Sequence, residues 1–236
     1  MTAPVAFRPL YEDNHLLVVE KAPNVPVQED ESRDADLLSL LKAYVKEKYA
    51  NPGKVFLGLV HRLDRPARGV MVFARTSKAA ARLSDQFRRK SVRKVYRAVV
   101  MGHPPESGHL KHHLLKDRSR NIVQAVPAGT REAKAAALNF RRLARDEANG
   151  LALIEIELIT GRSHQIRVQC AESGFPLWGD YKYGNSGHQQ PEGRTLALLS
   201  YGLELDHPTQ KDRRRFYCPA SPDGPPWSIV EPPASS

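Results

Sequence analysis

The spacing of apolar residues along the chain predicts three helices. The first covers residues 34–50, where apolar positions recur at helical intervals after Asp36. The second covers residues 76–90, and Thr76 is a suitable N-cap because its hydroxyl can accept a backbone N–H. The third is short and covers residues 162–173. Helices are therefore a minority of the predicted elements.

Short apolar or alternating runs between Gly and Pro signals predict more strands than helices. These strands are expected at residues 15–22, 55–63, 70–74, 94–100, 110–115, 122–126, 135–143, 151–159 and 195–205. Strands and helices do not alternate regularly, which argues against a doubly wound parallel sheet. We therefore expect one α+β domain over residues 1–220, with a large, mainly antiparallel, mixed β-sheet flanked by helices and loops. Residues 221–236 are rich in proline and predict an irregular C-terminal tail.

Composition excludes several classes of protein. Of the 236 residues, 41% are hydrophobic and 26% are charged, which is ordinary for a globular protein. Two distant cysteines predict neither a disulfide framework nor a zinc site, and His103, His112 and His113 lack carboxylate or cysteine partners at metal-binding spacing. The chain has no apolar run of membrane-spanning length and no N-terminal leader pattern, so we expect a cytoplasmic protein without metal.

Positive charge is the first hint of a partner. The chain has 36 Lys and Arg against 26 Asp and Glu, a net charge of +10, and the basic residues cluster. The densest cluster runs from Arg82 to Arg97, and others lie at 111–120, 141–145 and 211–215. Basic clusters neutralise phosphates and release counterions, so they favour a polyanionic partner over a merely solvated basic face. Composition does not separate RNA from DNA or from an anionic membrane.

One carboxylate stands among cations in the segment Val60-His61-Arg62-Leu63-Asp64-Arg65-Pro66-Ala67-Arg68-Gly69-Val70. Nearby positive charges keep a carboxylate ionised, and an ionised, oriented carboxylate can act as a nucleophile or as an electrostatic stabiliser. Taken alone, Asp64 is more often a surface salt-bridge partner.

Two further motifs change that interpretation. One is Lys94-Val95-Tyr96, and the other is Gly161-Arg162-Ser163-His164-Gln165-Ile166-Arg167. Alone, each is ordinary, since Tyr96 could be strand packing and His164 a structural histidine. In this order and at these separations, the three motifs resemble those of the RluA family of RNA pseudouridine synthases. The opening run from Leu17 and the segment Gly179-Asp180-Tyr181-Lys182-Tyr183-Gly184 extend the resemblance over residues 10–208.

This chain departs from the family pattern at three positions. Ala67 and Arg68 replace the usual Thr and Ser, and Gln169 stands where a His often follows. The first change places an extra cation beside Asp64. The family's opening motif begins near residue 8, so we expect a short form without the extra N-terminal RNA-binding domain of many relatives.

The resemblance implies a reaction and the residues that perform it. The family isomerises specific uridines in structured RNA, rRNA or tRNA, to pseudouridine without cofactor, metal or second substrate. Asp64 would be the nucleophile on a flipped-out uridine, attacking the ribose or the base, or forming a glycal. Tyr96 would stack on the base and handle the C5 proton, and Arg167 would pair with Asp64, with Arg162 as a second candidate.

The predicted RNA contacts combine the motifs with the basic helix. They are His61, Arg62, Arg65, Arg68, Arg88, Arg89, Lys90, Lys94, Arg162, His164 and Gln165. RNA is the expected partner, and we expect a monomer. Two rival functions remain: a catalytically silent RNA-binding or ribosome-assembly factor on the same fold, and a hydrolase using a His–Asp pair. The hydrolase is weaker because no G-x-S-x-G nucleophile motif occurs.

Overall fold

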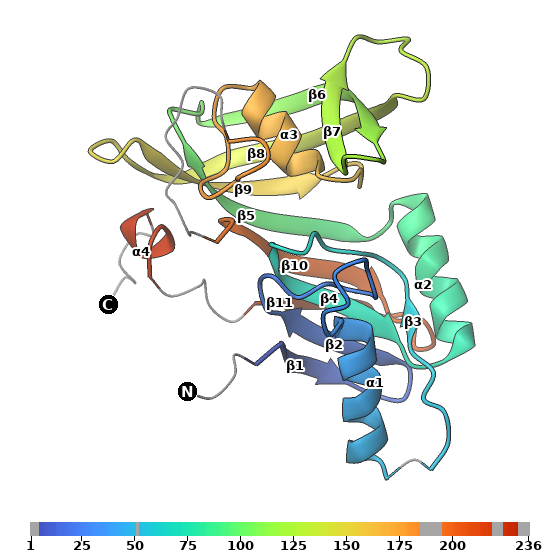
Figure 1. Cartoon of the computed structure of the whole chain (residues 1–236). Coiled ribbons are helices and arrows are strands. Elements are labelled where there is room, and N and C mark those ends of the chain that lie inside the picture. Colours follow the sequence, from blue (N-terminus) through green and yellow to red (C-terminus); the bar gives the residue numbers. More distant parts are fainter. Residues whose placement is uncertain (1–4, 51, 185–194, 219–223, 231–236) are drawn as a thin grey trace. The chain divides into compact units, whose positions relative to one another are not determined.

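The structure is a computed structural model that describes residues 5–50, 52–184, 195–218 and 224–230. The chain separates into two compact units, which are treated one at a time (Figure 1). The first unit consists of Met1–Lys94 and Ser200–Pro219, and the second of Val95–Leu199 and Ala220–Ser236. Two strands, Arg93–Met101 and Leu198–Asp206, contribute residues to both units.

The first unit is built on antiparallel strands. Its strands are β1 (Phe7–Glu12), β2 (Leu16–Lys21), β3 (Gly58–Leu59), β4 (Arg68–Ala74), β10 (Leu198–Asp206) and β11 (Arg213–Tyr217). They follow the order β1-β2-β4-β10, with β11 beside β10 and β3 beside β4. Strand β2 pairs with β4 so that Lys21 is opposite Gly69 and Glu20 is opposite Val70. This register places the C-terminal end of β2 beside the segment that contains Asp64.

Two helices belong to the first unit, and both start at the type of residue that the sequence indicated. Helix α1 (Leu37–Lys48) begins after Asp36, whose carboxylate accepts the N–H of Ser39 at 3.0 Å. Helix α2 (Ser77–Arg89) begins after Thr76, whose hydroxyl accepts the N–H of Ala79 at 3.2 Å. Each cap satisfies a backbone donor that the first helical turn leaves without a partner.

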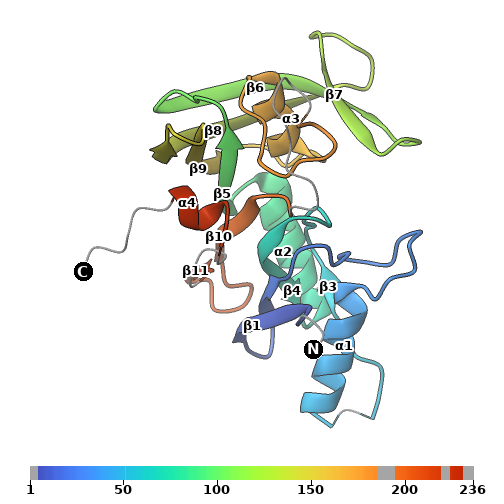
Figure 2. The same ribbon diagram turned by 60° about the vertical axis from the view of Figure 1, so that its left-hand side comes forward.

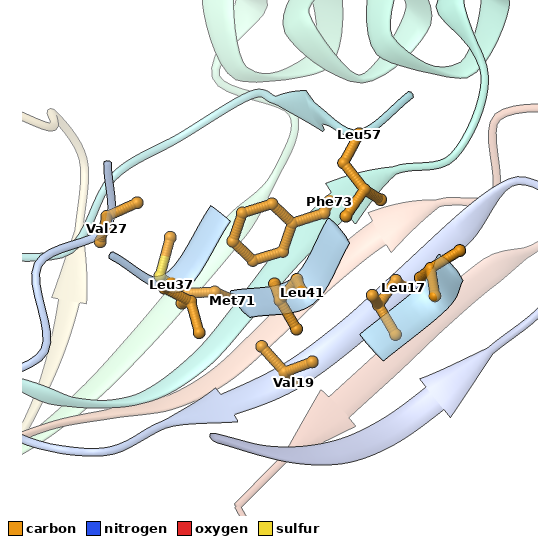
Figure 3. Close-up of a cluster of buried hydrophobic side chains, with 9 residues drawn as sticks. Leu17, Val19, Val27, Leu37, Leu41, Leu57, Met71 and Phe73 are labelled. Carbon is orange, nitrogen blue, oxygen red and sulfur yellow. The ribbon is translucent and has the colours of Figure 1, made fainter. Parts of the chain in front are cut away.

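The core of the first unit lies between α1 and the sheet (Figure 3). Alternate residues of β2 and β4, Leu17, Val19, Met71 and Phe73, pack against the buried side of α1. Because successive strand residues point to opposite faces, this packing determines which side chains of β2 face away from α1. The cluster shown in Figure 3 is formed by Leu17, Val19, Val27, Leu37, Leu41, Val45, Leu57, Met71 and Phe73.

The second unit is an antiparallel sheet with one main covering helix. Its strands are β5 (Arg93–Met101), β6 (Ser107–Asp117), β7 (Ile122–Val126), β8 (Lys134–Asp146) and β9 (Leu151–Leu158), in the order β5-β9-β8-β6-β7. Helix α3 (Gln165–Glu172) packs on β6 and β7 through Val168, Leu114 and Val123. Figure 2 shows this helix against the same strands from a second direction. The predicted α+β fold with a large, mainly antiparallel sheet is confirmed.

The C-terminal segment differs from expectation where it is described. Instead of an irregular tail, Trp227–Val230 forms the short helix α4, which contacts β8 and β9 and buries Trp227. Proline content suggested no helix here, but burial of an indole outweighs weak local propensity. Residues 221–223 and 231–236 of the predicted tail lie outside the described residues. The division into a catalytic domain over 1–220 and a tail stays a prediction.

Candidate active site

Asp64 lies on a tight turn between β3 and β4. The Asp64 turn, residues 64–67, is closed by the N–H of Ala67, which donates to the carbonyl of Asp64 at 3.0 Å. Strand β4 starts at the next residue, and Ala67 is fully buried. The Asp64 carboxyl group is therefore carried by a short irregular segment whose end is anchored in the sheet. Asp64 itself is half-buried.

A buried lysine holds the same turn from β2. The ammonium of Lys21 donates to the carbonyls of Ala22 and Val25, both at 2.8 Å, and to that of Arg65 at 2.9 Å. Burial lowers the pKa of Lys21 to about 7, and the negative charge of Asp64 opposes that lowering. Lys21 lies in the opening run from Leu17 that extends the family resemblance, and the motifs assign it no role. The available signal is the pair of ionisable residues, Glu20 and Lys21, that ends a strand of four apolar residues.

Two arginines beside Asp64 have carboxylate partners of their own. Arg65 forms an ion pair with Asp34 and donates to the carbonyl of Asn24 at 3.1 Å. Arg68 donates to Glu20 of β2 at 2.7 Å. Their expected phosphate contacts, and that of the exposed Arg62, stay predictions. The cationic surroundings read from the sequence are thus partly neutralised within the first unit.

His61 is held by the protein's own groups. Its Nε2 accepts the N–H of Val72 at 3.0 Å, and its ring stacks on Phe87 of α2 with centroids 4.7 Å apart. Burial, with a smaller effect of the Lys94 charge, lowers the pKa of His61 to about 3, so the imidazole is neutral. His61 therefore ties the segment before Asp64 to β4 and α2. A direct contact of this ring with RNA stays a prediction.

The end of α2 carries the predicted basic cluster. Arg88 and Arg89 are exposed, and both pair with Asp85 of the same helix. Lys90 caps the helix in the left-handed conformation. Burial lowers the pKa of Lys94, which begins the Lys-Val-Tyr motif on β5. Exposed ion pairs contribute little to stability, so Arg88 and Arg89 can exchange Asp85 for phosphate at low cost.

Two residues with predicted catalytic roles belong to the second unit. Tyr96 lies on β5 opposite Ile156 and is 8% exposed. Arg167 on α3 is 1% exposed and forms a two-pronged ion pair with Asp180, from Nε to Oδ2 at 2.7 Å and from Nη2 to Oδ1 at 2.6 Å. The expected pair between Arg167 and Asp64 joins residues of different units and stays a prediction.

Asp180 is the main residue that sequence reasoning missed. It is fully buried, and besides Arg167 it accepts the N–H groups of Lys182 and Tyr183 at 3.0 and 3.2 Å. A buried guanidinium needs such a partner because desolvation of an isolated charge is costly. In the sequence, the signal for Asp180 is its place in the segment Gly179–Gly184, which extends the family resemblance.

The segment before α3 is ordered by its polar side chains. Gln165 is buried; its Oε1 accepts the hydroxyl of Thr160 at 2.7 Å and the N–H of Arg162 at 3.0 Å. His164 has a left-handed backbone and bonds through Nδ1 to the hydroxyl of Tyr183. Arg162 is exposed and donates to the carbonyl of Ala135. Gln165 thus has an internal role, and the RNA contacts expected of all three stay predictions.

Gln169, where relatives often have His, is accommodated by β6. Its Nε2 donates to the carbonyl of Leu110 and to Nδ1 of His112, each at 3.1 Å.

Over the described residues, no group of three or more His, Cys, Asp or Glu side chains could hold a metal ion. Among the helices described, none is long and apolar enough to cross a membrane.

Comparison with known proteins agrees with the motifs. The family model described as RNA pseudouridylate synthase matches residues 15–172. An RNA pseudouridine synthase from Chloroflexus aurantiacus is 35% identical over 208 residues, covering 88% of this chain and 61% of the relative. Ribosomal large subunit pseudouridine synthase D from Pseudomonas aeruginosa is 34% identical over 227 residues, covering 91% of this chain and 68% of the relative.

A solved structure has the same fold. Human RNA pseudouridylate synthase domain containing 4 matches with a TM-score of 0.74 at 24% identity, covering 89% of this chain and 87% of that one. The chain spans only 61% of the length of the Chloroflexus relative. The family model covers well over half of this chain, and both relatives are named as pseudouridine synthases. The chain therefore belongs to the RNA pseudouridylate synthase family, as the resemblance of its motifs to the RluA branch predicted.

Proposed function

We propose that this protein isomerises uridine in structured RNA to pseudouridine, with Asp64 as the nucleophile. The observation that carries the proposal is the Asp64 turn. A hydrogen bond from the N–H of Ala67 to the carbonyl of Asp64 closes the turn, and the buried Lys21 ammonium binds the carbonyl of Arg65 within it. A nucleophile is effective when its approach to the reacting atom is set before substrate binds. Family membership supplies the reaction for which such a carboxylate is needed.

The chemistry conserves the atoms of the nucleotide. The N1–C1′ bond breaks, the uracil rotates, and a C5–C1′ bond forms while C5 loses a proton and N1 gains one. Asp64 forms a transient bond to the ribose or the base, or removes a sugar proton to give a glycal. Tyr96 stacks on the base and takes part in removal of the C5 proton. Arg167, oriented by Asp180, holds the Asp64 carboxylate in place.

The partner we propose is RNA, bound by the monomeric protein in the cytoplasm. Exposed cations at the end of α2, together with Arg62 and Arg65 near Asp64, supply phosphate contacts. The uridine flips out of its stack at a cost of a few kcal/mol. The Pseudomonas relative is named for the large ribosomal subunit, so ribosomal RNA is the first substrate to test and tRNA the second.

The test is Asp64→Asn, which removes the charge and keeps the shape. We expect wild-type protein to isomerise uridine at defined sites in RNA, and Asp64→Asn to make no pseudouridine while binding the same RNA with unchanged affinity. Base-resolved mapping and a filter-binding assay measure the two effects. Asp146→Asn, at the last residue of β8 where the carboxylate accepts the N–H of Asn149, is the matched control and should remain active. Activity retained by Asp64→Asn would refute the assignment.

The same experiment decides the alternative of a catalytically silent RNA-binding factor. That alternative predicts tight RNA binding by the wild-type protein with no isomerised uridine in any RNA.

A further inference from the structure

Arg68, where the family pattern has Ser, makes a specific contact with a buried carboxylate. Its Nε donates to Oε1 of Glu20 at 2.7 Å, and its Nη2 lies 2.6 Å from the same oxygen. The preceding Ala67 replaces the usual Thr, so this turn lacks both hydroxyl groups of the pattern. A long charged side chain therefore occupies a position where the family has a short polar one.

Glu20 has a fully satisfied carboxylate. It is 4% exposed, and its second oxygen accepts from Nε of Arg8 at 3.1 Å. A carboxylate bridging two guanidinium groups keeps a partner when either arginine is removed. Single substitutions in this network consequently need not leave an unpaired buried charge, which would cost several kcal/mol.

Strand β2 holds the Asp64 turn with two consecutive residues. The Lys21 ammonium binds the carbonyl of Arg65 at 2.9 Å, and the Glu20 carboxylate binds the side chain of Arg68. Adjacent strand residues point to opposite faces of the sheet, so the two contacts approach the segment from different sides. They bracket the hydrogen bond between Ala67 and Asp64 that closes the turn.

We propose that the Glu20–Arg68 ion pair is a positioning device that fixes the end of the Asp64 turn, at the positions where the family pattern has Thr and Ser. Resting on the proposed function, it assigns Glu20 and Arg68 to the orientation of Asp64, without contact to the reacting atoms. Two guanidinium nitrogens of Arg68 on one oxygen of the buried Glu20 carboxylate suit this task because they restrict the geometry of the arginine.

A phosphate contact by Arg68 makes a different prediction. In that case Glu20 competes with RNA for the guanidinium, so Glu20→Gln would leave the rate unchanged and RNA affinity equal or higher. Arg68→Ser would then weaken RNA binding and reduce its salt dependence. If the pair positions Asp64 instead, both substitutions should slow the reaction, because removing either partner breaks the same contact.

The experiment measures single-turnover rate and RNA affinity for Glu20→Gln, Arg68→Ser and the double variant. We expect each single variant to lower the rate about 10-fold to 100-fold, because small displacements of a reacting group have effects of this size. RNA affinity should stay unchanged, and the double variant should be no slower than the slower single variant, as expected for two residues acting as a unit.

The matched control is Glu204→Gln on β10. Glu204 is 7% exposed and lies between Arg93 at 2.8 Å and Arg215 at 3.6 Å, so it has the same chemistry as Glu20 without touching the Asp64 turn. The Glu204→Gln variant should have a lower free energy of unfolding and an unchanged single-turnover rate. The inference is overturned if Glu20→Gln keeps the wild-type rate, or if the rate loss is the same in Glu204→Gln. A wild-type protein that isomerises no uridine would instead refute the proposed function itself.

Discussion

The neutral imidazole of His61 makes folding dependent on pH. Its pKa is about 3 in the folded protein and about 6.5 in the unfolded chain, where solvent reaches the ring. Between these values the unfolded chain binds a proton that the folded protein does not, so the free energy of unfolding falls as pH decreases from 6.5 towards 3. At pH 5 this contribution amounts to about 2 kcal/mol.

His61→Gln tests this dependence, because glutamine offers an oxygen to the N–H of Val72 and cannot ionise. At pH 7.5 the variant should be less stable than wild type, since stacking on Phe87 is lost. The difference in unfolding free energy should shrink by about 2 kcal/mol at pH 5. Urea unfolding at both pH values measures it. An equal difference at the two pH values would show that His61 carries no such linkage.

At the scale of single residues, the sequence indicates which residues are candidates for the site better than it indicates what those residues contact. Asp64, Tyr96 and Arg167 could be selected from motif order alone. The ion pair between Arg167 and Asp180 could not, because it joins a helix to a loop 13 residues later and depends on burial of both groups. Likewise, no local pattern indicates that the Lys21 ammonium donates to three carbonyl oxygens.

Helices α1 and α2 could be predicted to within three residues at each end, because N-caps and helical spacing are local signals. The strand expected over residues 55–63 is reduced to Gly58–Leu59. Leu57 is apolar because it packs in the core of the first unit, without belonging to a strand. In the sequence, β11 is visible only as a basic cluster, because three consecutive arginines replace the alternation of apolar and polar residues that predicts a strand.

Gly69 allows β4 to pass close to β10. It has φ of +128°, and a Cβ atom there would lie 2.3 Å from the carbonyl oxygen of Ser200. Gly69→Ala should therefore lower the unfolding free energy by about 2–4 kcal/mol, from backbone strain together with the clash. It should also slow isomerisation, because the displaced residue adjoins Arg68. Chemical denaturation and single-turnover assays measure the two effects.

Gly129→Ala separates strain from clash. Gly129 also has positive φ, +87°, but a Cβ atom would meet nothing within 4 Å. We expect a loss of only about 1 kcal/mol for the control. If both variants lost the same stability, close packing of β4 on β10 would not explain Gly69.

The net charge of +10 overstates how many basic side chains are unpaired, because several of them form ion pairs within the protein. In the cluster at 211–215, Arg213 pairs with Asp206, and Arg215 lies 3.6 Å from Glu204 across the β10–β11 ladder. Arg65 and Arg68 likewise have internal partners. Basic clusters along a sequence therefore overstate the number of cations ready to bind phosphate.

RNA binding should nevertheless weaken steeply with salt. With about five phosphate contacts, affinity should fall roughly 100-fold to 500-fold between 50 and 200 mM salt. Replacing Arg88 and Arg89 together with Gln should reduce the slope of log affinity against log salt by about 1 to 2. Lys46→Gln, an exposed cation in the last turn of α1, is the control and should leave the slope unchanged. A salt-independent affinity would contradict phosphate binding.

The most direct test of the account measures the proton that leaves uracil C5. Formation of the C5–C1′ bond releases this hydrogen to water, so RNA labelled with tritium at uridine C5 reports the reaction without knowledge of the site. Wild-type protein should release tritium from structured ribosomal RNA, and Asp64→Asn, bound to the same RNA at equal occupancy, should release none. Equal release by the two proteins, or no release by wild type from ribosomal RNA or tRNA, would contradict Asp64-dependent isomerisation.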